Sequence, residues 1–215
     1  MNTEIKYEPK TLDDYIFPTK KIEDTVGMYV SGCTSKPLIL HGPVGTGKSL
    51  LANLIPKAID GPKVQVDKVY TDDLKTRGDV EKKLTRAETF DHFFEVNQQG
   101  QNYTIFDECV VDEKVHRDAL LNAMDVMRGR GLIIFTTNKF NQFMPAVVSR
   151  STEIYVPAVS PEMFLPRAKF ILNCEGVDIP EHALLNALAA TQAIREDNRL
   201  YYGALDQIIY KATCR

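Results

Sequence analysis

Eight residues near the start of the chain have the types and spacing that bind a nucleoside triphosphate. Gly42–Ser49 reads Gly-Pro-Val-Gly-Thr-Gly-Lys-Ser and fulfils the phosphate-binding pattern GxxxxGKS. Its glycines permit backbone conformations that a Cβ atom would resist, so successive N–H groups can turn toward phosphate oxygens. Lys48 is expected to reach the β and γ phosphates, and Ser49 to bind Mg²⁺. The residues expected around ATP here are Gly42, Pro43, Val44, Gly45, Thr46, Gly47, Lys48, Ser49 and Leu50.

A second group of candidate residues ends an apolar run further along the chain. Tyr103–Phe106 is followed by two carboxylates, Asp107 and Glu108. Two adjacent carboxylates most often mark the solvent-exposed end of a strand. Where a complete phosphate loop precedes them in the chain, they are expected to act in metal binding and catalysis. We expect Asp107 to hold Mg²⁺, directly or through water, and Glu108 to orient a water for attack on the γ phosphate.

Two later polar residues complete the candidate set. Asn138 follows the apolar run Leu132–Phe135 and two threonines, where its amide would contact the attacking water or the γ phosphate. The alternative is a turn-forming asparagine. The segment Asn138–Asn141 approximates the guanine-reading pattern NKxD but ends in Asn, not Asp, which favours adenine. Arg150 lies far along the chain from the phosphate loop, so we expect it either to reach a neighbouring subunit's nucleotide or, as most isolated arginines do, to cap a helix end or form an ion pair on the surface.

The elements that must position these residues follow from the hydrophobic pattern. Short β-rich runs alternate with helical stretches, which predicts an α/β fold with a parallel sheet covered on both faces. Three runs are nearly all apolar and should be the central strands. The expected strands are 38–40, 64–70, 103–106, 132–135 and 153–156.

Beyond Pro157 and Pro161 the pattern is helical, with no strand candidate. We therefore expect two domains, 1–157 and 158–215, and three tail helices at 161–174, 181–194 and 198–213. In the last of these, Leu200, Ala204, Ile208 and Ala212 recur every four residues beside Leu205 and Ile209, which predicts a buried stripe. Pro56, in the helix expected after the phosphate loop, should kink or end that helix.

Composition bounds the class of protein. The 215 residues have a net charge of −3, 44% hydrophobic and 26% charged residues, which is ordinary for a globular protein and argues against a coat of positive charge for nucleic acid. The four cysteines are scattered without a CxxC spacing, which favours thiols over zinc or disulfides. Without a signal peptide or an apolar stretch of membrane length, we expect no membrane partner and a cytoplasmic location, the host's if the protein is viral.

Together these residues resemble the AAA+ ATPases, and within them the small subunits of DNA-polymerase clamp loaders, particularly of phage type. Tyr7–Pro18 is similar to the family's opening YRPKTLDD box and the residues after it. Asp107-Glu108 matches its Walker B pair and Asn138 its sensor 1. Val148–Ser151 is similar to its SRC motif, and Asp197–Arg199 resembles its GDxR.

The resemblance implies a P-loop α/β domain with a five-stranded parallel sheet of order 5-1-4-3-2, followed by a three-helix lid. It implies that Tyr7, Ile16 and Phe17 line an adenine pocket. It also implies that Arg150 acts in trans as an arginine finger, and that Arg199 senses nucleotide state from the lid. ATP and Mg²⁺ are the implied cofactors, and other AAA+ subunits, DNA and a sliding clamp or helicase the implied partners.

The family's DNA-tracking segment also has a counterpart. Arg77 and Gly78 ahead of 80–83 resemble its RG at a helix start, which makes Arg77, Gly78 and Lys82 candidates for contact with DNA phosphates. A solvated helix face, with Lys82, Lys83 and Arg86 pairing with nearby glutamates, accounts for the same residues equally well.

Some positions depart from the family pattern. Glu8 replaces the arginine of the opening box, Ser151 the cysteine of SRC, and Leu120–Asn122 the family's LRR. The chain also stops after the expected lid, where clamp loaders continue into a collar domain. We therefore expect either a truncated chain or a reduced protein that assembles through its AAA+ faces.

Four functions compete at this stage. The leading one is an ATP-hydrolysing, clamp-loader-like protein of DNA replication that assembles on DNA or a ring-shaped partner. A helicase loader or another partner-remodelling AAA+ ATPase keeps the motor but changes the cargo. A small-molecule kinase would share the loop, but Glu108, Asn138 and Arg150 suit water attack and subunit coupling better. The intact Glu108 also disfavours a scaffold that never hydrolyses ATP.

Overall fold

The computed structural model describes residues 2–70, 101–108 and 113–213. These residues fall into two packing units. The described residues within 21–42 and 48–155 form the sheet unit, and those within 1–20, 43–47 and 156–215 form the helical unit. The predicted domain boundary near residue 158 stays a prediction.

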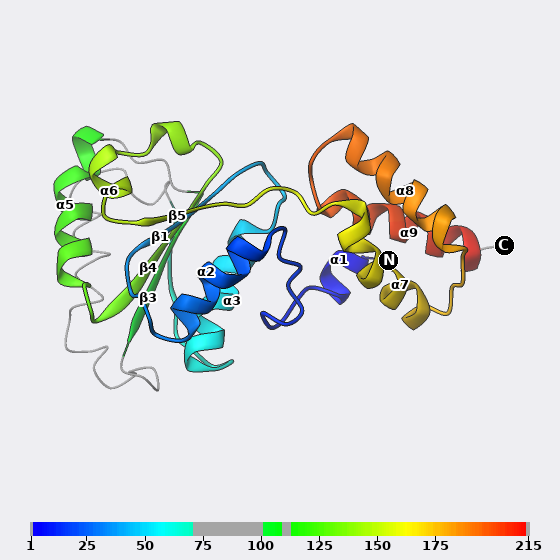
Figure 1. The fold of residues 1–215 in the computed structure, drawn as a ribbon, viewed down its shortest axis with the longest axis horizontal. Coiled ribbons are helices and arrows are strands. Elements are labelled where there is room, and N and C mark those ends of the chain that lie inside the picture. Colours follow the sequence, from blue (N-terminus) through cyan, green and yellow to red (C-terminus); the bar gives the residue numbers. More distant parts are fainter. Residues whose placement is uncertain (1, 71–100, 109–112, 214–215) are drawn as a thin grey trace. The chain divides into compact units, whose positions relative to one another are not determined.

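A five-stranded parallel sheet forms the centre of the sheet unit (Figure 1). Its order in the described chain is β2-β3-β4-β1-β5, which is 5-1-4-3-2 read from the other edge and confirms the predicted sheet. The three most apolar strands are central because both of their faces are buried. The strands are β1 (Leu38–His41), β2 (Asp67–Tyr70), β3 (Asn102–Asp107), β4 (Gly131–Thr137) and β5 (Thr152–Tyr155).

Helices cover both faces of this sheet (Figure 1). Helices α2 (Lys20–Val30) and α3 (Lys48–Asp60) lie on one face, and α5 (Glu113–Val126) and α6 (Pro145–Val148) lie on the other, with the short η3 (Phe140–Gln142) between β4 and α6. Alternate strand residues supply the core on the α5 side, where Ile39, Phe106 and Phe135 pack against Leu120, Met124 and Met127.

Helix α3 does not end at its proline. Pro56 lies inside the helix, which continues to Asp60, so the alternative that the helix ends there is wrong, and the alternative that it kinks there stays a prediction. A proline inside a helix costs roughly 3 kcal/mol through its missing N–H and its ring contacts. Leu54, Ile55 and Pro56 are all buried, and we attribute the continuation to this burial, which offsets that cost.

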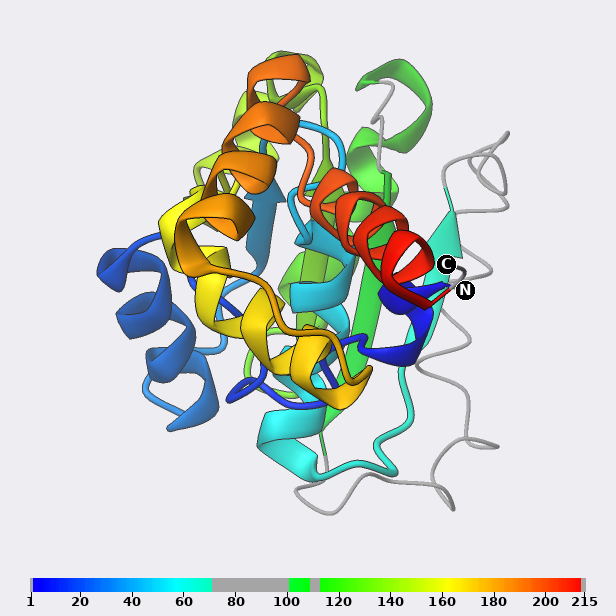
Figure 2. The same cartoon turned by 90° about the vertical axis from the view of Figure 1, so that its right-hand side faces the viewer.

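Four helices form the described helical unit: α1 (Thr3–Lys6), α7 (Pro161–Cys174), α8 (Glu181–Ile194) and α9 (Arg199–Thr213). Helix α1 lies against α9 (Figure 2), where the Thr3 backbone N–H donates to Asp206 Oδ1 at 3.1 Å. The last three helices fall where the sequence predicts them, the third starting one residue later.

The buried stripe of α9 agrees only in part with the predicted one. Leu205 and Ile209 are buried as predicted, but Leu200 is only partly buried, Ala212 is exposed, and the third buried residue, Tyr201, was not predicted. The Tyr201 ring stacks on Phe164 with centroids 4.7 Å apart, and its hydroxyl donates to the Val159 carbonyl. This tyrosine therefore sets the inward face of α9.

None of the helices that the structure describes has the length and apolar composition needed to cross a membrane.

Candidate nucleotide site

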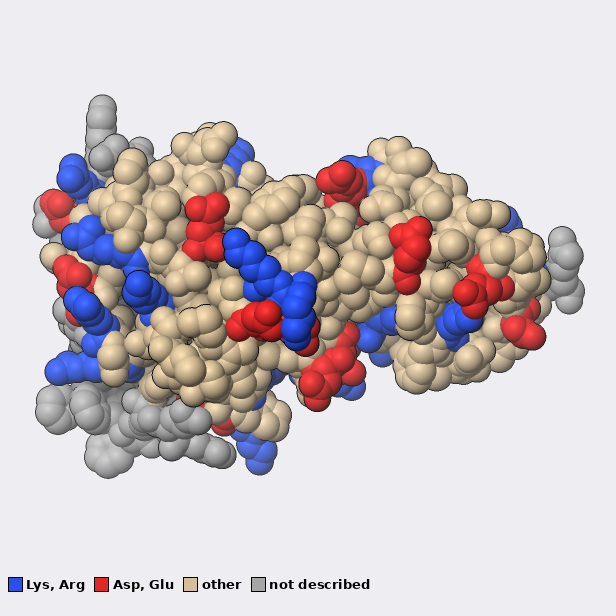
Figure 3. Space-filling view, in the orientation of Figure 1, with Lys and Arg blue, Asp and Glu red and all other residues tan. Residues whose placement is uncertain are grey.

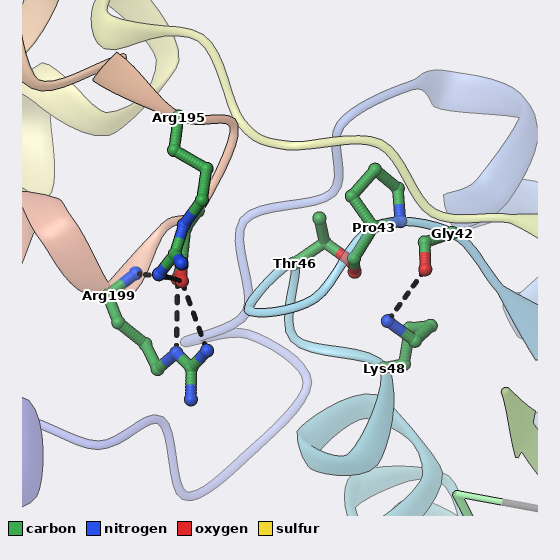
Figure 4. A network of polar contacts seen from close by, with 7 residues as sticks. Gly42, Pro43, Thr46, Lys48, Arg195 and Arg199 are labelled. Carbon is green, nitrogen blue, oxygen red and sulfur yellow. Dashed lines mark hydrogen bonds and ion pairs between the residues drawn. The ribbon is translucent and has the colours of Figure 1, made fainter. Parts of the chain in front are cut away.

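The phosphate loop has the backbone that its sequence predicts. Gly42, Gly45 and Gly47 have φ angles of 144°, 78° and 91°, the region that favours glycine. Lys48 opens α3 and is buried, and its Nζ donates to the Gly42 carbonyl at 3.0 Å (Figure 4). A closed turn across the loop is fixed by Thr46, whose hydroxyl donates to the Pro43 carbonyl at 3.1 Å.

The two predicted Mg²⁺ ligands are in direct contact in the sheet unit. Ser49 Oγ donates to Asp107 Oδ1 at 2.7 Å, although 58 positions separate them in the chain. Neighbouring ligands of an octahedral Mg²⁺ lie about 2.9 Å apart, and this ion prefers hydroxyl, carboxylate and phosphate oxygens. The pair therefore fits Mg²⁺ by both donor type and spacing.

Thr136 is a member of this cluster that the sequence analysis missed. Its hydroxyl donates to the same Asp107 Oδ1 at 2.6 Å and accepts the backbone N–H of Glu108 at 3.0 Å. The parallel pairing of β3 with β4 brings these residues together, because Phe106 pairs with Phe135 one position earlier. A polar residue at the end of each of two neighbouring parallel strands was the available signal.

Glu108 adopts an unusual backbone conformation. Its φ of 52° lies in the left-handed region, which costs a residue with a side chain about 1 to 2 kcal/mol. The bond from its N–H to Thr136 helps to hold that conformation. Such strain clusters at active sites, where the surrounding structure maintains it. The side chain of Glu108 is exposed at the end of β3.

Asn138 lies one residue beyond β4, the strand between β3 and β1. It is exposed, and the turn that carries it is closed by the Lys139 N–H, which donates to Thr137 Oγ1 at 3.0 Å. The predicted place of Asn138 at the tip of a central strand is therefore confirmed. Its contact with water or phosphate stays a prediction.

Arg199 is held by an acidic neighbour in the helical unit. Its Nε and Nη2 donate to the two oxygens of Asp197 at 3.0 Å each, and Arg195 Nη2 donates to Asp197 Oδ2 at 2.6 Å (Figure 4). Burial by itself raises the pKa of Asp197, but the bonds from Arg199 and Arg195 outweigh it and hold the pKa below its usual range. Arg199 thus begins α9 as part of a three-residue charge network.

Asp197 also lies directly against the phosphate loop. A Cβ atom added to Gly45 would come within 1.8 Å of Asp197 Oδ1, a distance that no real side chain tolerates. Gly45 is therefore required by this close approach as well as by its φ angle. A Cβ atom added to Gly47 would lie 3.3 Å from the ring of Tyr15, which is a tight contact but a much smaller overlap than that at Gly45.

The residues expected around adenine lie in the helical unit. Tyr7 and Ile16 pack against the core of the helical bundle. The Tyr7 hydroxyl donates to Glu175 Oε1 at 2.6 Å, and Phe17 makes an edge contact with Tyr15 at 5.0 Å. Leu50 is partly buried and Val44 is exposed. An adenine contact for this set stays a prediction.

Arg150 follows α6 and caps its end. Its Nη1 donates to the Ala146 carbonyl at 3.0 Å, which is the helix-capping contact that the sequence offered as one alternative. The residue also lines a pocket of about 400 Å³ in the sheet unit, together with two more cations, Lys36 and Arg128, one carboxylate, Asp125, and apolar residues that include Met124 and Ile133. Lys and Arg side chains gather on this α5 side of the sheet unit (Figure 3).

The three DNA-contact candidates, Arg77, Gly78 and Lys82, lie outside the described residues. The alternative solvated helix face at the same positions lies there too. Both interpretations stay predictions.

Comparison with known families decides the class of this nucleotide site. The family described as the ATPase family associated with various cellular activities (AAA) matches residues 38–158, more than half of the chain. The chain belongs to the AAA family. The matched range contains the phosphate loop, Asp107, Glu108, Asn138 and Arg150, so the AAA assignment covers these candidate residues.

Curated relatives of this AAA chain carry replication factor C names. Replication factor C subunit 5 of Mus musculus is 26% identical over 186 residues, covering 83% of the chain and 52% of the relative. Replication factor C small subunit 1 of Pyrobaculum islandicum is 21% identical over 179 residues, covering 83% and 54%. The chain thus spans about half the length of these curated relatives.

Solved structures show the same fold. A mutant of RuvB from Thermotoga maritima superposes with a TM-score of 0.72 at 16% identity, covering 94% of this chain and 65% of that one. A second RuvB mutant gives 0.70 at 17% identity, covering 92% and 64%.

Proposed function

We propose that the protein is an ATP-hydrolysing, Mg²⁺-dependent AAA+ protein of DNA replication that acts as part of a clamp loader. Membership of an ATPase family supports hydrolysis, and the replication factor C relatives support the clamp-loader role. The single observation that carries the chemistry is the contact of Ser49 with Asp107 beside Glu108. This contact supports a Mg²⁺ site formed by Ser49 of α3 and Asp107 of β3, next to the proposed general base Glu108.

Each residue has a distinct part in this chemistry. Lys48 and the loop amides neutralise charge on the β and γ phosphates. Ser49 and Asp107 hold Mg²⁺, which when bound offsets the charge that develops on the phosphates. Glu108 accepts a hydrogen bond from the attacking water and orients it, and Asn138 contacts that water or the γ phosphate.

The proposed action involves more than one subunit. Arg150 stabilises the transition state on a neighbouring subunit's ATP. In support, the pocket that Arg150 lines with Lys36 and Arg128 has three cations to one carboxylate, Asp125, which favours an anion there. Arg199 relays nucleotide state to the helical lid. The proposed partners are other AAA+ subunits, DNA and a ring-shaped clamp. Domains 1–157 and 158–215 would be the catalytic domain and the lid.

Phosphate release in the presence of Mg²⁺ or EDTA, and with or without DNA, tests the proposal. We expect Mg²⁺-dependent release in wild type and a 10²- to 10⁴-fold lower rate in Glu108→Gln, because the variant lacks a general base. A fluorescent ATP analogue should still bind Glu108→Gln and fail to bind Lys48→Ala. Full hydrolysis by Glu108→Gln would overturn the assigned base, and pull-down with a helicase but not a clamp would overturn the clamp-loader role.

A further inference from the structure

Asn198 connects residues 45 and 46 of the phosphate loop to residue 159 and to the start of α9 through three hydrogen bonds. Its backbone N–H donates to the Gly45 carbonyl at 3.1 Å. Its side-chain Nδ2 donates to the Thr46 carbonyl at 3.2 Å. Its Oδ1 accepts the N–H of Val159 at 2.9 Å. All four residues belong to the helical unit.

The partners leave the Asn198 amide one orientation. A backbone N–H can donate only to the amide oxygen, and a backbone carbonyl can accept only from the amide nitrogen. Val159 offers the donor and Thr46 the acceptor, so a flipped amide would lose both bonds. The Asn198 side chain therefore holds the phosphate loop in a fixed position relative to residue 159.

The hydrogen bonds that fix the orientation of two loop carbonyls also fix the orientation of two loop N–H groups. In a planar trans peptide the C=O of one residue and the N–H of the next point in opposite directions. With the carbonyls of Gly45 and Thr46 turned toward Asn198, the N–H groups of Thr46 and Gly47 are presented on the opposite side of the loop. Amides presented together in this way form the concave anion site of a phosphate loop.

The neighbours of Asn198 in the sequence add further contacts to the phosphate loop. Asp197 lies against Gly45, and Arg199, the first residue of α9, is bonded to Asp197. The segment 197–199 therefore contacts the outside of the phosphate loop and carries the proposed lid sensor in three consecutive residues. A change of loop conformation must move this segment or break its bonds.

We propose that Asn198 is a positioning residue that presets the phosphate loop for the triphosphate and links the loop to helix α9. The inference rests on the proposed function, in which this loop binds ATP. Asn198 itself touches no phosphate and acts through the peptide planes of Gly45 and Thr46. Loss of the Asn198 side chain should weaken the binding of ligands whose phosphates the loop holds, and should spare ligands without phosphates.

Two variants and one control test this role. Asn198→Ala removes both side-chain bonds, and Asn198→Asp keeps the bond to Val159 but sets a carboxylate against the Thr46 carbonyl. Asn186→Ala, at an exposed position of α8, is the matched control. We expect the Kd for ATP and ADP to rise about 10-fold in Asn198→Ala, and further in Asn198→Asp because its negative charge lies beside an anion site.

The pattern across ligands separates positioning from simple stability. We expect the Kd for adenosine to change less than about 2-fold in Asn198→Ala, and the KM for ATP to rise more than kcat falls, because the loop binds phosphates and not the nucleoside. A lower melting temperature with an unchanged Kd for ATP would make Asn198 merely structural and overturn the inference.

A nucleotide-free measurement keeps this result separate from the proposed function. The ¹⁵N–¹H resonances of Thr46 and Gly47 should shift or broaden in Asn198→Ala relative to wild type and Asn186→Ala. Unchanged resonances would overturn the inference even if wild type bound no nucleotide. If the wild-type protein binds no nucleotide but these resonances still shift in Asn198→Ala, the proposed function is overturned while the positioning role of Asn198 is supported.

Discussion

One carboxylate oxygen organises the proposed catalytic residues. Asp107 Oδ1 accepts hydrogen bonds from Ser49 and Thr136, and Thr136 in turn accepts the N–H of Glu108. The hydroxyl of Thr136 thus connects the metal-binding carboxylate to the backbone of the proposed base. Because Glu108 is in a left-handed conformation, removal of that acceptor leaves the strained residue with one support fewer.

Thr136→Val tests this connection at nearly constant volume. We expect kcat for ATP to fall at least about 10-fold, since the variant frees the Glu108 N–H and the Asp107 oxygen, which disturbs the base more than the phosphate loop. Steady-state ATPase assays with a parallel nucleotide-binding titration measure both effects. Thr104→Val, in the buried interior of β3, is the control and should retain near wild-type kcat. Equal loss of kcat in both variants would contradict the role of Thr136.

Helix α9 and the phosphate loop meet so closely that the residue types of both are constrained. Gly45 faces the carboxylate of Asp197, which Arg195 and Arg199 hold in place. Gly61, at the end of α3, has a comparable φ of 89° but no atom within 4 Å of an added Cβ. A comparison of the same substitution at the two glycines therefore separates the cost of backbone strain from the cost of steric overlap.

Gly45→Ala should lower stability and ATP affinity well beyond the effect of Gly61→Ala. Both variants incur about 1 to 2 kcal/mol of left-handed strain, and Gly45→Ala adds overlap with Asp197. Urea unfolding and nucleotide titration measure the two effects. The double variant Gly45→Ala with Asp197→Ala should recover part of the loss because the overlap is gone. A strictly additive double variant would show that the carboxylate is not the obstacle.

The charge network at the start of α9 should give stability a specific pH dependence. The pKa of Asp197 is lower in the folded protein than its usual value of about 3.9, because Arg199 and Arg195 outweigh burial. This stabilisation is present above about pH 4 and is lost as pH falls through the folded-state pKa.

Replacement of the carboxyl should therefore matter most near neutral pH. We expect the difference in unfolding free energy between wild type and Asp197→Asn to be largest above pH 5 and to narrow below pH 4, as measured by urea unfolding across this range. Asp178→Asn, an exposed position between α7 and α8, serves as the control. A difference that stays constant from pH 6 to pH 3 would contradict the network's contribution.

We propose that a second copy of this chain or a related subunit completes the site. Arg150 is an exposed cation among Lys36 and Arg128, and its contact with Ala146 holds it at the end of α6. A preset guanidinium of this kind can contribute about 10³- to 10⁵-fold in rate when it reaches a neighbour's phosphates. Hydrolysis per subunit should then rise with protein concentration through the assembly range.

Mixing two inactive variants tests the shared site directly. Arg150→Ala keeps its own Glu108, and Glu108→Gln keeps its own Arg150, so each can complete the other. If copies of this chain neighbour one another, an equal mixture should recover about a quarter of the wild-type rate, since random pairing makes one site in four complete. Arg130→Ala, an exposed arginine outside the pocket lining, is the control and should be active alone. Recovery at no mixing ratio, under conditions where wild type hydrolyses ATP, would remove the trans role.

Local pattern determined much of this protein from its sequence. The phosphate loop, the apolar strands ending in Asp107-Glu108 and the three tail helices were all predicted, because glycine pattern and hydrophobic periodicity depend on near neighbours. The sheet order came from resemblance to a family, and the structure confirms it.

Tertiary structure alone decided which distant residues meet. Thr136 joins Asp107 because parallel register aligns the ends of β3 and β4, and Asn198 reaches Thr46 across 152 positions. Tyr201 was missing from the predicted buried stripe of α9, and it packs on Phe164 of another helix, a contact that the pattern of one helix does not reveal. Such pairings depend on how whole elements pack, and packing is a property of the assembled chain rather than of any segment of it.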